Sequence, residues 1–499
     1  MINLKENLKL IAGLKSEIVW KWFAIISSID RGSGREKALA ELLVKVAAIF
    51  NCEWLIDEIN NVVIYVPATP GCEDYPSICL QGHLDMVTVG QNGEKDFDTS
   101  TVKFLRENGK MRADRTTLGA DNGLGVAIGL ALLEGGVSHG PLELLFTVDE
   151  ETGLNGATSL NPDWIKSKLL INLDSERWGE ITLGCAGGRR IVTTVPITFS
   201  TDEKSEDLKF TIELADLPGG HSGVDIGKGR PNAILILARI ILDLITRFPE
   251  LRLLSFDGGT FSNAIPGQSR ATLTFKSYSP ELMDSIRLVV ESEQIALREI
   301  PLEKEPKLTI SEMEKIEDGR SYFADEFTLA FLGGLLKLPN GAIDMDEFDP
   351  TTVETSNNVA IVKTNEDGLE ITTMYRSSAV DGLQKIEELS IGALQNLPGA
   401  KLSLGDEYPA WQPQDSSQLL ELAKIVFDNL FNKELKRVVV HAGLECALFT
   451  KKWPDMQMIS IGPTIEGGHS QDEYVEVETV DACYRWLLIV LAGLNEINA

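Results

Sequence analysis

The chain is poor in the features that mark membrane and secreted proteins. Its 499 residues contain no run of about 18 apolar residues, the length that a helix needs to span a bilayer. The first residues, MINLKENLKLIAGL, lack the long apolar segment and the small-residue cleavage site of a secretory signal. Six cysteines are scattered without a CxxC pair, which indicates reduced thiols. These absences favour a cytoplasmic protein.

Basic residues are also scarce. The sequence has 46 Lys and Arg against 75 Asp and Glu, which gives a formal net charge of −29. Such a negative potential argues against nucleic acid or an anionic membrane as a partner. Hydrophobic residues make up 43% of the chain and charged residues 24%, the balance of an ordinary globular protein. Because a single hydrophobic core stops growing below this length, we expect two or more domains.

The order of apolar patterns predicts an α/β domain interrupted by an insert. Residues 1–190 begin with amphipathic helical patterns and continue with strand-length apolar runs between polar loops. This alternation is typical of a mixed, mostly parallel sheet with helices on both faces. Residues 191–405 alternate half-polar strands with helices, which predicts an α+β lid domain with an antiparallel sheet. Residues 406–499 resume the first pattern and complete the α/β domain.

Only five histidines occur, and two of them belong to a scattered set of acidic motifs. The set consists of His83 and Asp85 in QGHLDM, Asp121 in GADNG, Glu150 and Glu151 in TVDEETG, Asp174 in INLDSE and His469 in EGGHS. Nearly every member stands where an apolar run gives way to a polar loop. Because sites in open α/β sheets form beyond the carboxyl ends of the strands, we expect these side chains to converge.

Spacing gives several of these residues a candidate role. His83 and Asp85 point the same way along a strand, so Asp85 can orient the imidazole. Asp121 lies in a glycine-flanked turn that frees its carboxylate to bridge two ions. Glu150 and Glu151 are neighbours and cannot easily share one role. One of them can bind metal while the other deprotonates a water beside it.

The donors suffice for two metal ions. His83 and Asp174 would serve one ion and Glu151 and His469 the other, with Asp121 between them. Mixed imidazole and carboxylate ligation suits Zn²⁺, and also Mn²⁺ or Co²⁺. Two ions about 3.5–4 Å apart can hold a water and lower its pKa, as in two-metal hydrolases. Each fragment taken singly is more often structural than a ligand, but their order along the chain favours the metal site.

The same stretches resemble a known family. QGHLDMV, TLGADNGLG, LLFTVDEETGLNGA, INLDSE, GGHSGVDIGKGRPNA and IGPTIEGGHS follow one another between residues 81–470. They are similar to motifs of the co-catalytic zinc peptidases related to carboxypeptidase G, carnosinase, tripeptidase T and peptidase V. GCAGG, YRSS and HAGLEC narrow the resemblance to the aminoacyl-histidine (Xaa-His) dipeptidase branch. Ala447 departs from the glycine that usually continues the last motif.

The resemblance implies a role for each acidic motif and a catalytic function for the α/β domain. The implied metal ligands are His83, Asp121, Glu151, Asp174 and His469. Asp85 would be the orienting carboxylate and Glu150 the general base. The resemblance also implies a cis peptide bond between Asp121 and Asn122.

Other motifs supply candidate substrate ligands. His221 in LPGGHSGVD would stabilise an oxyanion, and Arg376 in MYRSS would bind a terminal carboxylate bidentately. Asn263 in FSNAIP would donate to the substrate, Gly443 in HAGLEC would offer backbone amides, and His441 would contact the substrate. From the residues alone, each of four side chains keeps an alternative. His221 would be a solvated histidine, Asn263 a turn asparagine, Arg376 part of a surface ion pair, and His441 a histidine one layer behind the substrate.

These motifs predict a two-metal dipeptidase for Xaa-His and other unblocked dipeptides, so that the partner is a small peptide. One alternative is a tripeptidase, carboxypeptidase or N-acyl amino acid deacylase on the same scaffold. Another is a non-catalytic metal- or peptide-binding protein. The insert is long enough for two β-α-β units, so we expect His221 to act within its own chain. The alternative is a homodimer in which the neighbour supplies this histidine.

Overall fold

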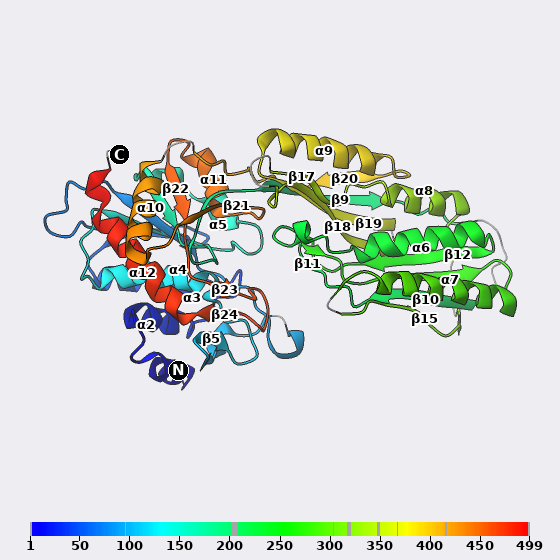
Figure 1. The fold of residues 1–499 in the computed structure, drawn as a ribbon, viewed down its shortest axis with the longest axis horizontal. Helices are drawn as coiled ribbons and strands as arrows, with labels where there is room; N and C mark the ends of the chain where they lie inside the picture. Colours follow the sequence, from blue (N-terminus) through cyan, green and yellow to red (C-terminus); the bar gives the residue numbers. More distant parts are fainter. Residues whose placement is uncertain are drawn as a thin grey trace. The chain divides into compact units, whose positions relative to one another are not determined.

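Two compact units make up the chain in the structure, a computed structural model (Figure 1). The structure describes residues 2–497 except residues 95, 201–207, 303, 317–320, 347–349, 367 and 415–416. Unit 1 comprises Met1–Gly184, Trp411–Val439 and Leu444–Ala499, and unit 2 comprises Cys185–Ala410 and Val440–Gly443. Among the described residues, no helix has both the length and the apolar character that crossing a membrane requires.

An eight-stranded sheet forms the centre of unit 1, in the order β1-β2-β6-β3-β7-β22-β8-β21. The strands are β1(Glu53–Ile56), β2(Val62–Val66), β3(Ile78–His83), β6(Leu142–Thr147), β7(Leu169–Asn172), β8(Glu180–Cys185), β21(Lys436–Val440) and β22(Gln457–Ser460). The central strands β6, β3, β7 and β22 run parallel to one another. Antiparallel pairs flank them, so the sheet is mixed, as predicted, and its parallel part is the centre.

Apolar sequence explains the central strands and their helices. Every residue of β3, β6 and β7 is buried, as expected for parallel strands covered on both faces. Helix α4 packs on β3, α3 on β1 and β2, and α10 on β22 and α12. The helices of unit 1 are α1(Ile2–Ile11), α2(Glu17–Ile26), α3(Lys37–Ile49), α4(Ala120–Leu133), α5(Asn155–Ser159), α10(Gln418–Phe431), α11(Glu445–Lys452) and α12(Val477–Ala492).

A smaller antiparallel sheet in unit 1 has the order β23-β24-β5-β4. Its strands are β4(Phe104–Glu107), β5(Lys110–Ala113), β23(Ile465–Glu466) and β24(Tyr474–Glu476). Short 3-10 helices occur at η1(Gln91–Gly93), η2(Thr99–Thr101), η3(Pro162–Trp164) and η5(Leu494–Glu496). This sheet matters for the site because the loop between β23 and β24 carries His469.

Unit 2 contains an antiparallel sheet whose main path is β15-β10-β14-β12-β18-β19-β9-β20, with β16 beside β10 and β17 beside β18. The strands are β9(Gly187–Val195), β10(Leu208–Ala215), β12(Leu251–Gly258), β14(Ser269–Phe275), β15(Lys307–Ile310), β16(Glu314–Lys315), β17(Gly341–Met345), β18(Val353–Asn365), β19(Gly368–Ser377) and β20(Lys401–Leu404). Strand β12 pairs with β18 at Gly258 and Val362, where two four-stranded halves of the described sheet meet. The predicted antiparallel sheet is present.

In the described part of unit 2, four helices cover the sheet (Figure 1). They are α6(Ala233–Arg247), α7(Pro280–Arg298), α8(Asp325–Leu335) and α9(Val380–Gln395); short elements are β11(Gly220–His221), η4(Ile226–Lys228) and β13(Ala264–Ile265). Helix α6 begins after Asn232, whose side chain accepts the backbone N–H groups of Ile234 and Leu235. Helices α6 and α7 contact strands of the first half and α9 contacts those of the second. The role of this unit as a lid stays a prediction.

We expect Trp486→Ala to destabilise unit 1 strongly. Trp486 is fully buried in an aromatic cluster with Trp178 and Phe427, and its indole N–H donates to the carbonyl of Ala423. Loss of such a side chain leaves a cavity and costs about 3–5 kcal/mol. Urea unfolding followed by circular dichroism measures the change. The matched control is Ile489→Ala on the same helix, where the side chain is 43% exposed; an equal loss in both variants would contradict the expectation.

Candidate functional site

The ends of three neighbouring strands bring a histidine and three acidic residues together in unit 1. His83 is the last residue of β3, Glu150 and Glu151 follow β6, and Asp174 follows β7. Because these strands are adjacent and parallel, their carboxyl ends lie at one edge of the sheet. The strand pattern therefore places four of the sequence-predicted residues side by side.

Asp121 and His469 join this edge from other elements. Asp121 lies in the first turn of α4, where its own dihedral angles and those of Asn122 are non-helical. The peptide bond between these two residues is cis, as the resemblance implies. His469 stands in the loop between β23 and β24 with a positive φ of 60°.

The carboxylate of Asp121 faces both imidazoles. Its Oδ1 lies 3.0 Å from Nε2 of His83, and its Oδ2 lies 3.3 Å from Nε2 of His469. Asp174 Oδ1 is 3.4 Å from the same His83 nitrogen, and Glu151 Oε2 is 3.0 Å from the same His469 nitrogen. Two triads result, one of His83, Asp121 and Asp174 and one of Asp121, Glu151 and His469, each with donor atoms within 4.8 Å of one another. The five predicted ligands thus share one location.

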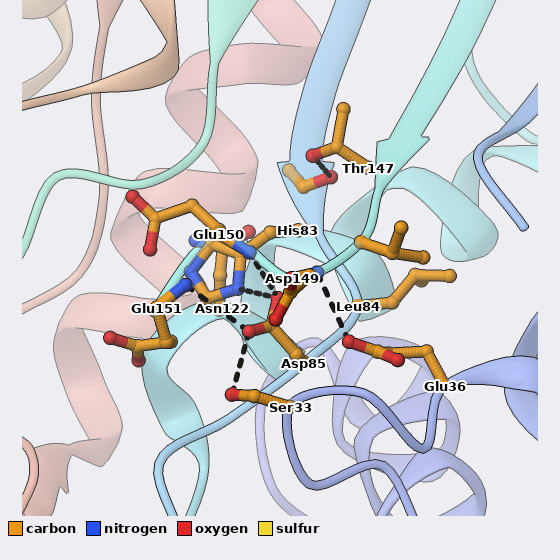
Figure 2. A network of polar contacts seen from close by, with 12 residues as sticks. Ser33, Glu36, His83, Leu84, Asp85, Asn122, Thr147, Asp149, Glu150 and Glu151 are labelled. Carbon is orange, nitrogen blue, oxygen red and sulfur yellow. Dashed lines mark hydrogen bonds and ion pairs between the residues drawn. The ribbon is translucent and has the colours of Figure 1, made fainter. Parts of the chain in front are cut away.

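Asp85 fixes this arrangement from behind. It is fully buried, and its Oδ1 lies 3.3 Å from Nδ1 of His83. The same carboxylate accepts the backbone N–H groups of Glu150 at 3.0 Å and Glu151 at 3.2 Å, and the hydroxyl of Ser33 at 2.9 Å (Figure 2). Burial acts to raise the pKa of Asp85, but His83 and these donors lower it below its usual value. One side chain therefore orients the imidazole and holds the backbone of the TVDEE turn.

The charges of this cluster suit a cation. Burial acts to lower the pKa of His83, yet Asp174 and Asp121 raise it well above its usual value. Burial also acts to lower the pKa of His469, but Glu151 and Asp121 raise this pKa to about 12. Protons on the imidazoles thus provide positive charge that divalent ions can replace. Oε1 of Glu151 is buried without a hydrogen-bond partner in the described part of the chain, so a donor atom is available to a metal.

Glu150 differs from its neighbour Glu151 in direction. Figure 2 shows the two carboxylates pointing apart from adjacent backbone positions. Glu150, His83 and Glu151 form a third group whose possible ligand atoms lie within 4.8 Å of one another. Burial raises the pKa of Glu150 well above its usual value, helped by the negative charges of Glu151 and Asp174 and opposed by His83. A carboxyl group with a raised pKa is suited to accept and return a proton.

A buried polar ladder behind the ligands was missed by the sequence analysis. Glu445 Oε2 accepts hydrogen bonds from Gln81 and, at 2.7 Å, from the hydroxyl of Thr147. Gln81 Oε1 in turn accepts from the side-chain amide of Asn172 at 2.6 Å, and the hydroxyl of Ser460 donates to Asn172. Gln81 and Asn172 stand two residues before His83 and Asp174. A polar residue inside each apolar strand was the signal that could have revealed the ladder.

In unit 2 the structure brings the predicted substrate ligands into one network. His221 pairs with Ala264 between β11 and β13, and the N–H of the next residue, Ser222, donates to the carbonyl of Asn263 at 2.8 Å. Gly223 packs against the carbonyl of His441, since a Cβ built at this glycine would lie 2.4 Å from that oxygen. The histidine loop of the insert thus contacts the HAGLEC motif.

Arg376 continues the same network. It is paired in the sheet with Ser356, whose hydroxyl lies 2.7 Å from Nε2 of His441. Its guanidinium donates to the hydroxyl of Tyr408, and the ring of Tyr408 lies against Gly443, 3.2 Å from a Cβ built there. Arg376 is only 5% exposed and its guanidinium donates to a hydroxyl, so the alternative of a surface ion pair is wrong.

The remaining candidates of unit 2 differ in burial. Burial, helped by Arg376 and His221, lowers the pKa of His441 to about 3, so this imidazole is neutral. His441 is buried against Ser356, as expected of a residue one layer behind the substrate. The side chain of Asn263 is exposed. Tyr408, which contacts both Arg376 and Gly443, had no signal in the sequence patterns.

The sequence profile of peptidase family M20/M25/M40 matches residues 79–492, and the chain belongs to this family. It is therefore a hydrolase. The chain is 36% identical over 488 residues to the cytosol non-specific dipeptidase of Escherichia coli strain K12, covering 96% of this chain and 97% of that protein. The aminoacylhistidine dipeptidase of Vibrio alginolyticus superposes with a TM-score of 0.75 at 32% identity, over 97% of this chain and 98% of that one.

A tripeptidase of Staphylococcus aureus has a TM-score of 0.55 at 14% identity, with 97% of this chain and 100% of that chain covered. At this identity the likeness shows the fold alone. The resemblance to the aminoacyl-histidine dipeptidase branch, stated from the motifs, is confirmed by the two dipeptidase relatives.

Glu445→Gln is expected to gain stability over the unsubstituted protein as the pH rises, when both are free of metal. Burial raises the pKa of Glu445 from its usual 4.5 to about 7, so the folded state keeps a proton that the unfolded chain releases. The stabilisation is complete below pH 4.5 and is lost as the pH rises through about 7. At 1.36 kcal/mol per unit, the difference is roughly 3 kcal/mol.

Urea unfolding of both proteins across this pH range measures the change. Glutamine keeps the shape of the protonated acid, so the difference between the two curves isolates the titration of Glu445. A difference that stays constant between pH 4.5 and 7 would contradict the assignment of the raised pKa.

Proposed function

We propose that this chain is a dipeptidase whose site holds two divalent metal ions and that it hydrolyses Xaa-His and other unblocked dipeptides. The main support is the position of Asp121, whose two carboxylate oxygens face two separate imidazole–carboxylate pairs. The names of the relatives from Escherichia coli and Vibrio alginolyticus, at 36% and 32% identity over nearly the whole chain, support the dipeptidase activity. The cytosolic name of the first relative supports a cytoplasmic location.

Five side chains would hold the ions. The ligands would be His83, Asp121 and Asp174 for one ion and Asp121, Glu151 and His469 for the other. This set of nitrogen and carboxylate donors suits Zn²⁺ and is compatible with Mn²⁺ or Co²⁺. When bound, the ions would polarise the peptide carbonyl and lower the pKa of water.

Glu150 would move the proton. In the proposed reaction its carboxylate takes a proton from the attacking water, whose oxygen forms the new bond to the carbonyl carbon. Glu150 then delivers that proton to the leaving nitrogen as the peptide C–N bond breaks. Asp85 supports both steps, because it holds the backbone N–H of Glu150 and the ring of His83.

His221 is suited to donate to the oxyanion. The backbone N–H groups of Gly223 and Val224 both lie 3.2 Å from its Nδ1 and donate to it. The neutral ring therefore carries its proton on Nε2, where it can be given in a hydrogen bond to a negative oxygen. We propose that this histidine acts within its own chain. Dipeptide hydrolysis by a strictly monomeric preparation tests that assignment against a homodimer.

The substrate would be held at its carboxyl end by a buried cation. Arg376 has an unpartnered Nε among the residues described, and its ordered partner is the neutral hydroxyl of Tyr408. A buried guanidinium without a carboxylate favours an anionic ligand, since an uncompensated buried charge is costly. The backbone of Gly443 and the exposed side chain of Asn263 would add further donors, while His441 would support Ser356 and Arg376.

A substrate panel is expected to separate the dipeptidase from its alternatives. Unblocked Xaa-His dipeptides should be cleaved with a higher kcat/KM than tripeptides or N-acetyl amino acids, because both relatives that match nearly the whole chain are named dipeptidases. Release of free amino acids, measured by chromatography, provides the rates. Faster cleavage of tripeptides or of N-acetyl amino acids would replace the dipeptidase by a sister activity.

Glu150→Gln should abolish turnover while the metal ions stay bound. Loss of a general base typically lowers kcat by about 10²–10⁴-fold, whereas none of the five proposed ligands is changed. Dipeptide kinetics and metal content by mass spectrometry are measured on the same preparation. The control is Glu134→Gln, which removes a carboxylate paired with Lys21 at the end of α4. Normal turnover in Glu150→Gln would remove the assignment of the base.

A further inference from the structure

The turn that precedes Asp121 is held by a buried carboxylate. Glu473 is 2% exposed, and it accepts three successive backbone N–H groups. Its Oε2 lies 2.7 Å from the nitrogen of Leu118 and 2.9 Å from that of Gly119, and its Oε1 lies 2.8 Å from that of Ala120. These are the three residues directly before Asp121, so their placement fixes the position of the backbone that carries the Asp121 carboxylate.

A buried cation holds the same turn by its carbonyl. Arg31 is fully buried, and its Nη2 donates to the carbonyl of Gly119. Its Nη1 donates to the carbonyls of Leu84 at 3.1 Å and Asp85 at 3.0 Å, which directly follow His83 in the chain. One guanidinium therefore ties the segment after His83 to the turn before Asp121.

Gly119 is the point where both contacts meet. Glu473 accepts its N–H and Arg31 donates to its carbonyl. Its φ is 69°, and a Cβ built there would lie 2.4 Å from Nη2 of Arg31, so only glycine fits this close approach. Since Glu473 stands four residues after His469, the two contacts connect the segments of both metal-binding histidines through one residue.

The charge of Arg31 belongs to the same arrangement. Burial lowers the pKa of Arg31 to about 10, against the opposing effect of Glu473 and Asp85, so the guanidinium is a cation at neutral pH. Neither Arg31 nor Glu473 takes part in the proposed chemical steps, yet both contact the backbone of ligand-bearing segments.

We propose that Arg31 and Glu473 are positioning residues that set the place of Asp121 between the two metal ions and thereby control the affinity for both ions together. This inference rests on the proposed two-metal function. Side chains that orient metal ligands from behind commonly change metal affinity by about 10–100-fold when they are substituted. Because Asp121 is shared, its displacement weakens both ion sites, whereas loss of Asp174 or His469 weakens the site of that ligand.

Zn²⁺ titration of the metal-free protein against a chelating dye tests this inference, with metal content by mass spectrometry. For Arg31→Met and Glu473→Gln we expect both Zn²⁺ dissociation constants to rise by at least about tenfold. For Asp174→Ala we expect one constant to rise. The matched control is Arg252→Met in unit 2, which removes another buried guanidinium that donates to backbone carbonyls, and it should leave both constants unchanged.

Arg31→Lys shows whether Arg31 acts through its bridging hydrogen bonds or through its positive charge alone. An ammonium group keeps the charge but does not reproduce the planar fork of donors that spans Gly119 and Asp85. We therefore expect the folded Arg31→Lys protein, checked by circular dichroism and Tm, to bind both ions weakly. Recovery of both constants by lysine would overturn the bridging role, and this variant also decides the matter if Arg31→Met does not fold.

The outcomes separate this inference from the proposed function. If the unsubstituted protein binds fewer than two Zn²⁺ ions, the two-metal function itself fails. If the unsubstituted protein and Arg31→Met both bind two ions with equal constants, only the positioning role fails. An unequal effect in Arg31→Met, with one constant changed and the other not, would also overturn the joint control of the two sites.

Discussion

The rest of the site depends on one carboxylate that is shared between two imidazoles. Asp121 offers one oxygen to His83 and the other to His469, residues that are 386 positions apart in the sequence. The strand ends supply the other carboxylates, Asp85 fixes the orientation of His83, and backbone contacts hold the turn before Asp121. Together these features keep the two oxygens of Asp121 in place.

Burial gives the two units opposite requirements for charge. In unit 1 several carboxylates are withdrawn from water around Asp121, and protonated imidazoles or bound cations are needed to offset their repulsion. In unit 2 the guanidinium of Arg376 is buried next to neutral partners, and the proposed substrate carboxylate would supply the negative charge there. A metal-dependent enzyme for substrates with a free carboxylate accounts for both imbalances, each argued from its own unit.

Much of the fold and of the candidate site could be predicted from local sequence. The apolar runs that end in QGHLD, TVDEE and INLD correctly indicated buried strands, and the half-polar strands of the insert correctly indicated an antiparallel sheet. Arg376 shows where local reading fails, because its burial comes from the sheet partner Ser356 and from Tyr408. The prediction of a mostly parallel sheet holds for the four central strands of unit 1. The strands beside them pair antiparallel, because tertiary contacts decide how edge strands pair.

The sequence by itself determined which residue types stand at the ends of strands, because the period of apolar residues fixes both the strand and the point where it stops. It thereby determined the candidate ligands His83, Glu151 and Asp174. Only the tertiary structure decided which oxygen of Asp121 faces which imidazole, and only it gave Arg31, Glu445 and Glu473 their partners. The physical reason is distance along the chain: contacts between residues separated by 38 to 364 positions leave no periodic pattern in either segment.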